Sequence, residues 1–377
     1  MSQQSPPQSG SPVEAGFSTR GFTYSNLADF ETRGPCLLFR AERQRRRSQA
    51  PTGEPVLVKR VQNTQDMRAR RRLLAEASVL LLLDHPAIPR VLEVAEHSTG
   101  PHLVLEYVEG MLLEWVLNKA AKRKQPLSEP FAAFVAAEVA DALHHAHTRT
   151  DESGKPLQLV HRAISPRTLM LTGSGAVKLN DFGAVRSVAP GQQSTDGAVL
   201  KGEVDYAAPE VLRAGVPDGR ADIFSLGLVL VELLTLRHPY DLPQVVKPPR
   251  LRGLFAQVLG RVCAERPSWA EPADLAARAA LLKPAVLARI LAPVSEPLRG
   301  IISRALRVSP DERYAAATEM RDALRALLRQ QHPGYGPEAV VREVRQVAAM
   351  AAREHGVVDT SEHTLPAAFK RLPTSRQ

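Results

Sequence analysis

The chain has 377 residues, 44% of them apolar, and a formal net charge of +9. This length and apolar share are enough for two lobes of one globular domain with tails, and they exclude a wholly disordered chain. The two cysteines, Cys36 and Cys263, lie far apart without paired spacing, which excludes a disulfide framework and favours a reducing cytoplasm. The longest apolar runs are interrupted by polar residues and no export signal opens the sequence, so we expect neither a membrane span nor export.

The first part of the chain predicts a tail followed by a small lobe. Residues 1–20 are rich in Ser, Gln, Pro and Gly, which predicts a disordered amino-terminal tail. Over residues 21–109 short apolar runs alternate with turns and predict strands at 36–39, 56–61, 88–94 and 102–106. One helix is predicted over 66–83, with a start signal at 63–64. Five apolar residues at helical spacing are expected on its buried face: Leu73, Leu74, Ala77, Leu80 and Leu81.

The rest of the chain has a helical period almost throughout. Over residues 110–330 we expect helices at 130–148, 221–236, 270–291, 298–306 and 314–328. Residues 331–377 predict one more amphipathic helix, ending near 356, and a tail; this helix either packs on the larger lobe or binds in trans. Its apolar face would contain Ala339, Val340, Val344, Val347 and Ala348. The element order predicts an α+β chain, with a mixed small lobe before a mostly helical large lobe.

Several motifs follow one another at regular intervals. Lys59 ends the run Val-Leu-Val-Lys, and Glu76 lies seventeen residues later on the predicted helix. Residues 105–110 read Leu-Glu-Tyr-Val-Glu-Gly, and 159–168 read Leu-Val-His-Arg-Ala-Ile-Ser-Pro-Arg-Thr. Further motifs are Asp-Phe-Gly at 181–183, Ala-Pro-Glu at 208–210, Asp-Ile-Phe-Ser-Leu-Gly at 222–227, and Arg313. In this order, from about residue 22 to 330, the motifs resemble the protein kinase superfamily, of the bacterial eukaryotic-like Ser/Thr type.

This resemblance implies a bilobal protein-kinase-like fold and a role for each motif residue. Lys59 would hold nucleotide phosphates, Glu76 would orient it, and Asp181 would bind Mg²⁺. The pocket for ATP would also be lined by Glu106, Val108 and Met170. Structural roles are implied for His161, Arg162, Phe182, Gly183, Glu210, Asp222 and Arg313. Among these, Glu210 is expected to pair with Arg313, and Asp222 to hydrogen-bond the backbone of the catalytic loop.

Other positions depart from the family pattern. Ala163 replaces the catalytic aspartate and cannot accept a proton, and Thr168 replaces the asparagine that binds the second Mg²⁺. The glycines of the phosphate loop would align with Glu31, Arg33 and Cys36, whose side chains block close approach to phosphate. Leu57 stands where the adenine pocket needs a small residue, and it could fill that pocket together with Met170. The sequence therefore predicts a degenerate member, a pseudokinase, with weak or absent ATP and Mg²⁺ binding.

Two alternatives remain open. An active Ser/Thr kinase could draw an atypical base from Glu203 or Asp205. A basic-surface binder could use the arginine-rich stretch 40–72, which has eleven Lys or Arg against three acidic residues. An acidic partner at Arg43 and Arg45–Arg47 is one form of this reading, whereas the lack of an aromatic platform argues against nucleic acid.

A pseudokinase would act on a protein partner, such as another kinase or a signalling protein. The segment 241–295 is a candidate docking region, and the segment 191–202, with Ser194 and Thr195, is a candidate for phosphorylation.

Overall fold

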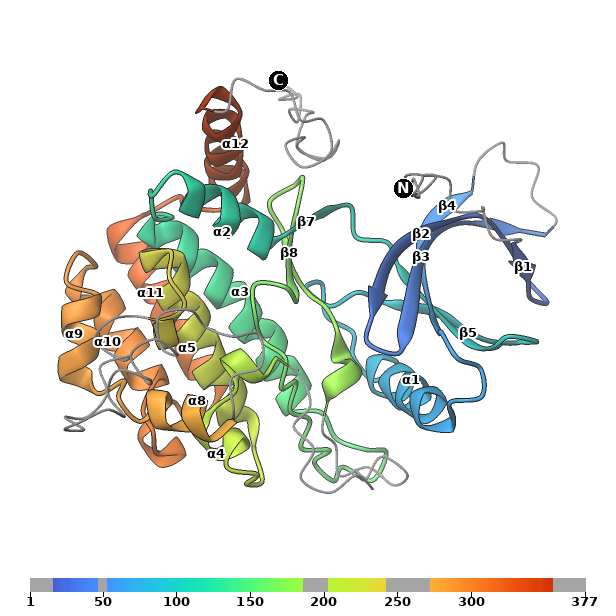
Figure 1. The fold of residues 1–377 in the computed structure, drawn as a ribbon, viewed down its shortest axis with the longest axis horizontal. Coiled ribbons are helices and arrows are strands. Elements are labelled where there is room, and N and C mark those ends of the chain that lie inside the picture. Colours follow the sequence, from blue (N-terminus) through green and yellow to red (C-terminus); the bar gives the residue numbers. More distant parts are fainter. Residues whose placement is uncertain (1–15, 47–52, 186–202, 242–271, 355–377) are drawn as a thin grey trace, which may run out of the picture. The chain divides into compact units, whose positions relative to one another are not determined.

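The computed structural model describes residues 16–46, 53–185, 203–241 and 272–354 (Figure 1). The chain divides into two compact units, of which the first comprises Met1–Asp84 and Pro89–Tyr107 and the second His85–Ile88 and Val108–Gln377. The first contains a sheet and one long helix, and the second is mostly helical. This confirms the expected α+β class, with a mixed part before a helical part.

The sheet of the first unit is antiparallel and has the strand order β1-β2-β3-β4-β6-β5. Its strands are β1 Phe17–Ser18, β2 Phe22–Arg33, β3 Cys36–Arg45, β4 Glu54–Val61, β5 Val91–His97 and β6 Gly100–Glu106. The sequence predicts four of these six, with β3 shorter and β5 starting earlier, at residue 88. Ile88 instead belongs to the second unit.

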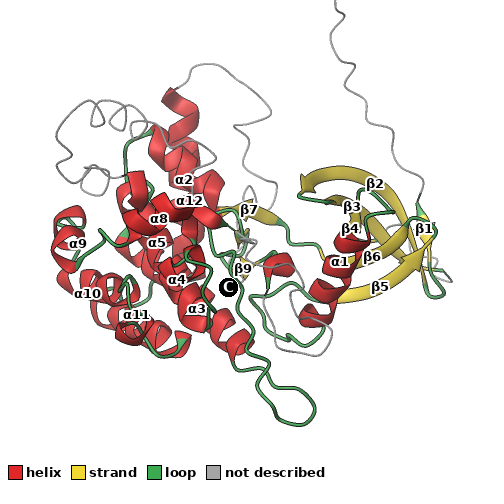
Figure 2. Cartoon of the chain, turned by 60° about the horizontal axis from the view of Figure 1, so that its bottom comes forward, coloured by secondary structure: helices red, strands yellow, loops and turns green. Residues whose placement is uncertain are grey.

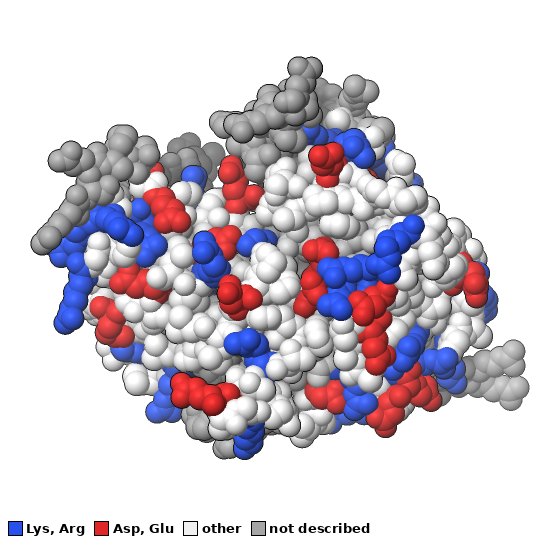
Figure 3. Space-filling view, turned by 180° about the vertical axis from the view of Figure 1, so that it is seen from behind, with Lys and Arg blue, Asp and Glu red and all other residues white. Residues whose placement is uncertain are grey.

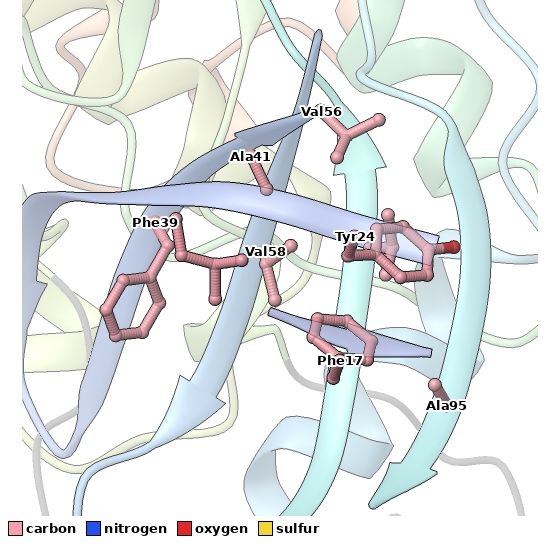
Figure 4. Packing of buried hydrophobic residues seen from close by; sticks show 9 residues of the cluster. Phe17, Tyr24, Phe39, Ala41, Val56, Val58 and Ala95 are labelled. Atoms are coloured by element: carbon pink, nitrogen blue, oxygen red, sulfur yellow. The ribbon is translucent and has the colours of Figure 1, made fainter. Parts of the chain in front are cut away.

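One face of this sheet carries an apolar core (Figure 4). The Phe17 ring stacks on the Tyr24 ring with centroids 4.4 Å apart, and Phe39, Val56 and Val58 are buried in the same cluster. Phe17 was expected in the disordered tail, so the start of the folded part at residue 21 is wrong: β1 belongs to the fold because it covers Tyr24. Residues 1–15 lie outside the described ranges.

The long helix of the first unit is α1, Met67–Leu80, which runs beside the sheet (Figure 2). It begins at Asp66, whose carboxylate accepts hydrogen bonds from the main-chain N of Arg68 and of Ala69, each at 3.0 Å. The buried face contains Ala69, Leu73, Glu76, Ala77, Val79 and Leu80. Leu74 and Leu81, which were expected on this face, are 41% and 62% exposed. That part of the prediction is wrong, because apolar residues lie on both sides of this helix.

The second unit combines helices with a small sheet of order β7-β8-β9. Its strands are β7 Gly110–Leu112, β8 Leu169–Thr172 and β9 Val177–Leu179. Its helices are α2 Leu113–Lys122, α3 Glu129–His147, α4 Pro209–Leu212, α5 Gly219–Thr235, α8 Pro272–Ala279, α9 Pro284–Ile290, α10 Glu296–Ala305, α11 Ala317–Gln331 and α12 Pro337–Glu354. Helices α3 and α5 pack against each other and against α11, and they are apolar nearly all round because they form the core.

The helices differ from the sequence prediction in two places. Helix α2 was not predicted, although Leu113, Val116 and Leu117 are buried on one side of it. The single helix expected over 270–291 is two helices, α8 and α9, because the proline at residue 284 lacks the N–H that an uninterrupted helix would need. Across the ranges described, no helix is long and apolar enough to span a membrane.

The predicted carboxy-terminal helix is α12, and it packs in cis on α2 and α3. Glu343 accepts hydrogen bonds from Ser128, at 2.8 Å from the main-chain N and at 2.6 Å from the hydroxyl Oγ. At the start of α12, the Pro337 carbonyl lies against Gly175 in the β8–β9 turn, so closely that a Cβ there would overlap it. The structure thus favours packing on the larger unit over binding in trans.

Candidate functional site

In the first unit, the expected lysine and glutamate form a buried ion pair. Side chains alternate along β4, so Val56 and Val58 face the core and Lys59 faces the opposite side. Lys59 Nζ lies 2.8 Å from Glu76 Oε1 and 2.7 Å from Glu76 Oε2. Each residue is only 6% exposed. Because a buried charge is tolerated only beside an opposite charge, the pair holds the lysine in a defined position.

The other residues expected around a nucleotide belong to different units. Leu57 is half-buried on the face of β4 opposite to the core. Glu106 ends β6, where its carboxylate accepts a hydrogen bond from the Arg90 main-chain N at 3.2 Å. Val108 opens the second unit, and Met170 is half-buried on β8. That Leu57 and Met170 fill a pocket together stays a prediction.

The segment expected as a phosphate loop is a tight β-hairpin. Arg33 and Cys36 are paired residues of β2 and β3, and Gly34 between them has a φ of +56°. The Arg33 guanidinium lies 3.1 Å from the Glu31 carboxylate. Cys36 is buried. The three residues expected at the glycine positions thus belong to a regular hairpin, in which the Glu31 carboxylate is neutralised locally by Arg33.

In the second unit, one carboxylate organises the loop at 161–168. Asp222 at the start of α5 accepts hydrogen bonds from the main-chain N of His161 and of Arg162, both at 2.8 Å. His147 Nε2 also lies 2.8 Å from this carboxylate. Sequence reasoning gives no functional role to His147, because a partner 75 residues away leaves no local signal. Arg162 adopts a φ of +63°, a strained conformation for this residue type, and Asp222 holds it there.

The two substituted positions of this loop are bonded to each other. Ala163 is 3% exposed, and its carbonyl oxygen accepts a hydrogen bond from the Thr168 hydroxyl at 2.7 Å. The same hydroxyl accepts a hydrogen bond from the Ser165 main-chain N at 3.1 Å. Thr168 is itself buried. Its hydroxyl group therefore both donates and accepts a hydrogen bond within the loop.

Residues 181–183 form a turn beside this loop. Asp181 has a left-handed backbone with a φ of +64° and precedes a short 3₁₀ turn, Phe182–Ala184. The Phe182 ring packs edge-on against the His161 ring, with centroids 4.6 Å apart. Gly183 is exposed within the 3₁₀ turn. The structure thus places the expected carboxylate and the loop histidine on neighbouring segments of one unit.

His161 is fully buried and neutral. Burial lowers the pKa of its imidazole, and the nearby carboxylates of Asp222 and Asp181 only partly oppose this. Its Nε2 donates to the Asn180 carbonyl oxygen at 3.1 Å, and its Nδ1 accepts from the Ala163 main-chain N at 3.3 Å. Both bonds are satisfied by the neutral tautomer that carries its proton on Nε2, which we assign on this basis.

A second ion pair supports the helical unit. Arg313 donates from both terminal nitrogens to the two oxygens of Glu210, at 2.7 and 2.8 Å. Its side chain is completely buried and also donates from Nε to the Arg307 carbonyl oxygen at 2.7 Å. The structure therefore brings together the pair expected from the sequence. A planar guanidinium suits this two-point contact better than any other cation.

Of the two proposed substitute bases, Glu203 forms an ion pair with an arginine of the loop at 161–168. Glu203 lies 2.9 Å from the Arg167 guanidinium, which also lies 3.9 Å from Glu114. Asp205 belongs to the 3₁₀ turn Val204–Tyr206 that follows Glu203. A carboxylate held by an arginine is a weaker base, because the positive charge favours its ionised form.

Of the arginines at 43 and 45–47, Arg43 contacts other side chains of the fold. The Arg43 guanidinium lies 3.6 Å from the centre of the Phe22 ring and 3.7 Å from the Glu54 carboxylate. Arg45 and Arg46 are exposed at the end of β3. Arg47 lies outside the described residues, as do the candidate phosphorylation segment 191–202 and most of the candidate docking segment 241–295.

Comparisons with known proteins agree with this arrangement. A family model described as "Protein kinase domain" matches residues 45–324. The chain is 32% identical over 262 residues to the tyrosine-protein kinase MasK of Myxococcus xanthus. The aligned region covers 69% of this chain and 36% of that protein. The chain is 29% identical over 307 residues to the serine/threonine-protein kinase PknB of Mycolicibacterium smegmatis, covering 79% and 42%. The chain thus spans less than half the length of these curated relatives.

Proposed function

Because this chain belongs to the protein kinase domain family, we propose that it is a pseudokinase, a signalling or scaffold module of that family with little or no phosphoryl transfer. The observation that carries the proposal is the hydrogen bond from the Thr168 hydroxyl to the Ala163 carbonyl. It joins the position of the missing base to the position of the missing metal ligand. We place this role in the cytoplasm and expect another kinase or a signalling protein as the partner.

The missing base is the first chemical argument. In protein kinases an aspartate of this loop accepts the proton of the substrate hydroxyl, a contribution worth roughly 10²- to 10⁴-fold in rate. Ala163 offers only a methyl group, and this residue is buried. A side chain without lone pairs can neither orient nor deprotonate a hydroxyl, so the chain lacks the group that would perform this step.

The metal ligands fit magnesium–ATP only in part. Protein kinases hold two Mg²⁺ ions with an aspartate and an asparagine, and the metals neutralise charge on the phosphates. Asp181 retains the carboxylate, and Lys59 with Glu76 retains the phosphate-holding pair. The Thr168 oxygen, however, is already bonded to two main-chain groups of its own loop. We therefore infer weak or absent binding of the second metal.

The glycine-poor hairpin adds a steric argument. Backbone N–H groups approach phosphate closely only where side chains are absent. The side chains of Glu31 and Arg33 occupy this hairpin and bind each other. Only Gly34 in the hairpin lacks a side chain. The inference is that nucleotide, if bound, is held loosely.

The structural pairs explain why such a chain still folds. Glu210 with Arg313, and Asp222 with the loop backbone, are satisfied by protein groups alone. Neither contact needs nucleotide or metal. A family member can therefore lose turnover and keep the architecture that a partner would recognise.

One observation favours the second candidate, an active Ser/Thr kinase. The ion pair between Lys59 and Glu76 is formed, and kinase activity requires it. Against this candidate, the substitute base Glu203 is held by Arg167. A basic-surface binder has weaker support. Basic side chains gather at the left edge of the view in Figure 3, but charges of both signs mix over the rest of that face.

The test is a nucleotide titration combined with a transfer assay on the full chain. We expect ATP with Mg²⁺ to raise the melting temperature little or not at all, and Lys59→Ala to remove any shift. Labelled phosphate should not pass from ATP to the chain or to a protein substrate. Steady transfer that disappears in Asp181→Ala would contradict the proposal and support the active kinase.

A restoration experiment extends this test. The double variant Ala163→Asp, Thr168→Asn returns both family side chains to the loop. We expect it to remain without transfer, because the hairpin and Leu57 stay unchanged. Transfer by this variant alone would show that the loop is the sole defect, and that the hairpin argument is wrong.

A further inference from the structure

Exposed apolar side chains gather on one face of the first unit. Over the described ranges seven large apolar side chains are exposed, and five of them belong to α1, the two residues after it, and β5: Met67, Leu74, Leu81, Leu82 and Val94. Single exposed apolar residues are ordinary on protein surfaces, whereas a contiguous group marks an interaction site.

The spacing of these residues makes them a row. Met67, Leu74 and Leu81 are seven residues apart, which corresponds to two helical turns, so they lie above one another about 10 Å apart along the helix. Leu74 and Leu81 are turned about 100° around the helix from the buried Leu73 and Leu80. The row therefore runs along an exposed side of α1, from its first residue to the residue after its last.

Strand β5 extends this apolar surface. Val94 and Glu96 point to the same side of the strand, because side chains alternate and Ala95 between them is buried. The Arg70 guanidinium of α1 lies 3.0 Å from the Glu96 carboxylate, so this side of β5 faces α1. Val94, which is 39% exposed, therefore lies on the same side of the first unit as the row on α1. The row and Val94 together are called the α1 surface.

Helix α1 itself is strongly basic, although the acidic Asp66 caps it and Glu96 of β5 pairs with its Arg70. Helix α1 carries Arg68 and Arg70–Arg72, and it has no acidic residue in its first turn. Its one acidic residue is Glu76, which is buried with Lys59. An apolar row beside arginines complements a segment with apolar residues at helical spacing and acidic neighbours.

We propose that this α1 surface binds an acidic amphipathic helix of a partner protein. A second copy of the chain fits poorly, because it would set arginines against arginines. The segments of this chain outside the described ranges also fit poorly by sequence, since 47–52, 186–202, 242–271 and 355–377 each carry more basic than acidic residues and 1–15 carries one acidic residue. This inference adds to the proposed function a surface that would bind the partner. The binding itself does not depend on whether the chain transfers phosphate.

The test uses the full chain and a labelled acidic peptide of about 18 residues, or five helical turns. The peptide has leucines at helical spacing and glutamates between them. One control peptide has the same composition with scrambled order, and another has lysine in place of glutamate. We expect fluorescence anisotropy to show binding of the acidic peptide and of neither control peptide. Leu74→Ser and Arg71→Glu should each weaken binding about tenfold or more, and both should keep the wild-type melting temperature because these side chains are exposed.

Matched variants at other exposed positions distinguish binding at this surface from nonspecific binding. Leu281→Ser removes a similarly exposed leucine of the second unit, and Arg329→Glu reverses an exposed arginine of α11. Neither should change binding. The proposal is overturned if the acidic peptide does not bind, if the lysine peptide binds equally, or if the control variants weaken binding as much.

Self-association of the chain through the α1 surface would also overturn the proposal. If sedimentation shows a dimer that Leu74→Ser dissociates, a second copy occupies the surface. Each of these failures would leave the proposed function standing, because the nucleotide and transfer assays use no peptide and do not involve this surface.

Discussion

The Thr168 hydroxyl donates to the Ala163 carbonyl oxygen at 2.7 Å, which joins two substitutions that are five residues apart in sequence. The hydroxyl also accepts from the Ser165 main-chain N at 3.1 Å, so the loop is closed by its own side chain. One side chain therefore bonds to the main chain at both Ala163 and Ser165. On the proposed function, this hydroxyl is engaged within its own loop.

Thr168→Val tests this closure. Valine keeps the shape of threonine but leaves a buried N–H of Ser165 and a buried carbonyl of Ala163 without this partner, so the free energy of unfolding should fall by about 1–3 kcal/mol. Urea denaturation measures the change. Thr318→Val on α11, where no side-chain hydrogen bond is found, is the control and should change little. Equal stability of Thr168→Val and wild type would mean that the hydroxyl does not support the loop.

Arg313→Lys tests the buried pair. Lysine keeps the charge but cannot make the two-point contact with Glu210 or reach the Arg307 carbonyl with the same geometry, so we expect a loss of about 3 kcal/mol. Arg304→Lys is the surface control. Arg304 lies 3.2 Å from Glu319 with side chains that are 50% and 42% exposed, and this change should cost less than about 1 kcal/mol. Similar losses for the two variants would contradict the role of burial.

Glu343→Gln tests the attachment of α12. An amide oxygen can replace only one of the two carboxylate oxygens that accept from Ser128, so the change should destabilise the second unit by about 1–3 kcal/mol. Hydrogen exchange should rise in α12 and at the start of α3. Glu152→Gln, in an exposed turn, should have no such effect. Unchanged exchange in Glu343→Gln would show that apolar contacts alone hold the helix.

The buried histidine predicts a pH dependence of stability. Burial lowers the pKa of His161 below 6.5, so the unfolded chain binds a proton at a pH where the folded chain does not. Its contribution to stability is complete above about pH 6.5 and is lost as the pH falls below that value, down to the folded pKa. Burial raises the pKa of Asp222, but bonds to His147 outweigh this and keep it below 3.8, so the loss from Asp222 begins only at lower pH.

The measurement is the urea midpoint between about pH 7.5 and about pH 5.5. Wild type should lose stability over this interval, and His161→Gln should lose less, since it has no group to protonate there. His332→Gln changes a histidine without a side-chain hydrogen bond and should retain the wild-type slope. If His161→Gln shows the full slope, another group is responsible for the pH dependence.

The sequence predicts the site where its motifs resemble the kinase family. Lys59 and Glu76 were paired through this resemblance, because a strand alternation and a helical period fix the side of each residue but not its partner. Glu210 and Arg313 required the family pattern, because 103 residues separate them. The bond between Ser128 and Glu343 has neither a local period nor a family motif, and only the structure reveals it.

The errors of the prediction have physical causes. A helical period alone cannot choose between two apolar sides of α1, so Leu74 and Leu81 were assigned to the core although they are exposed. Phe17 lies beside a polar, proline-rich stretch whose composition hides a two-residue strand. The break between α8 and α9 could have been predicted, because Pro284 falls inside the assumed helix.

Gly175 adopts a φ of +83° directly beneath the Pro337 carbonyl, where a Cβ has no room. The packing of α12 therefore depends on a glycine in a turn that is far from it in the sequence. A homologue with a larger residue at this turn could contain the same helix in its sequence, but the helix could not pack in this position. The residue at this one position therefore predicts whether the carboxy-terminal helix packs on the second unit.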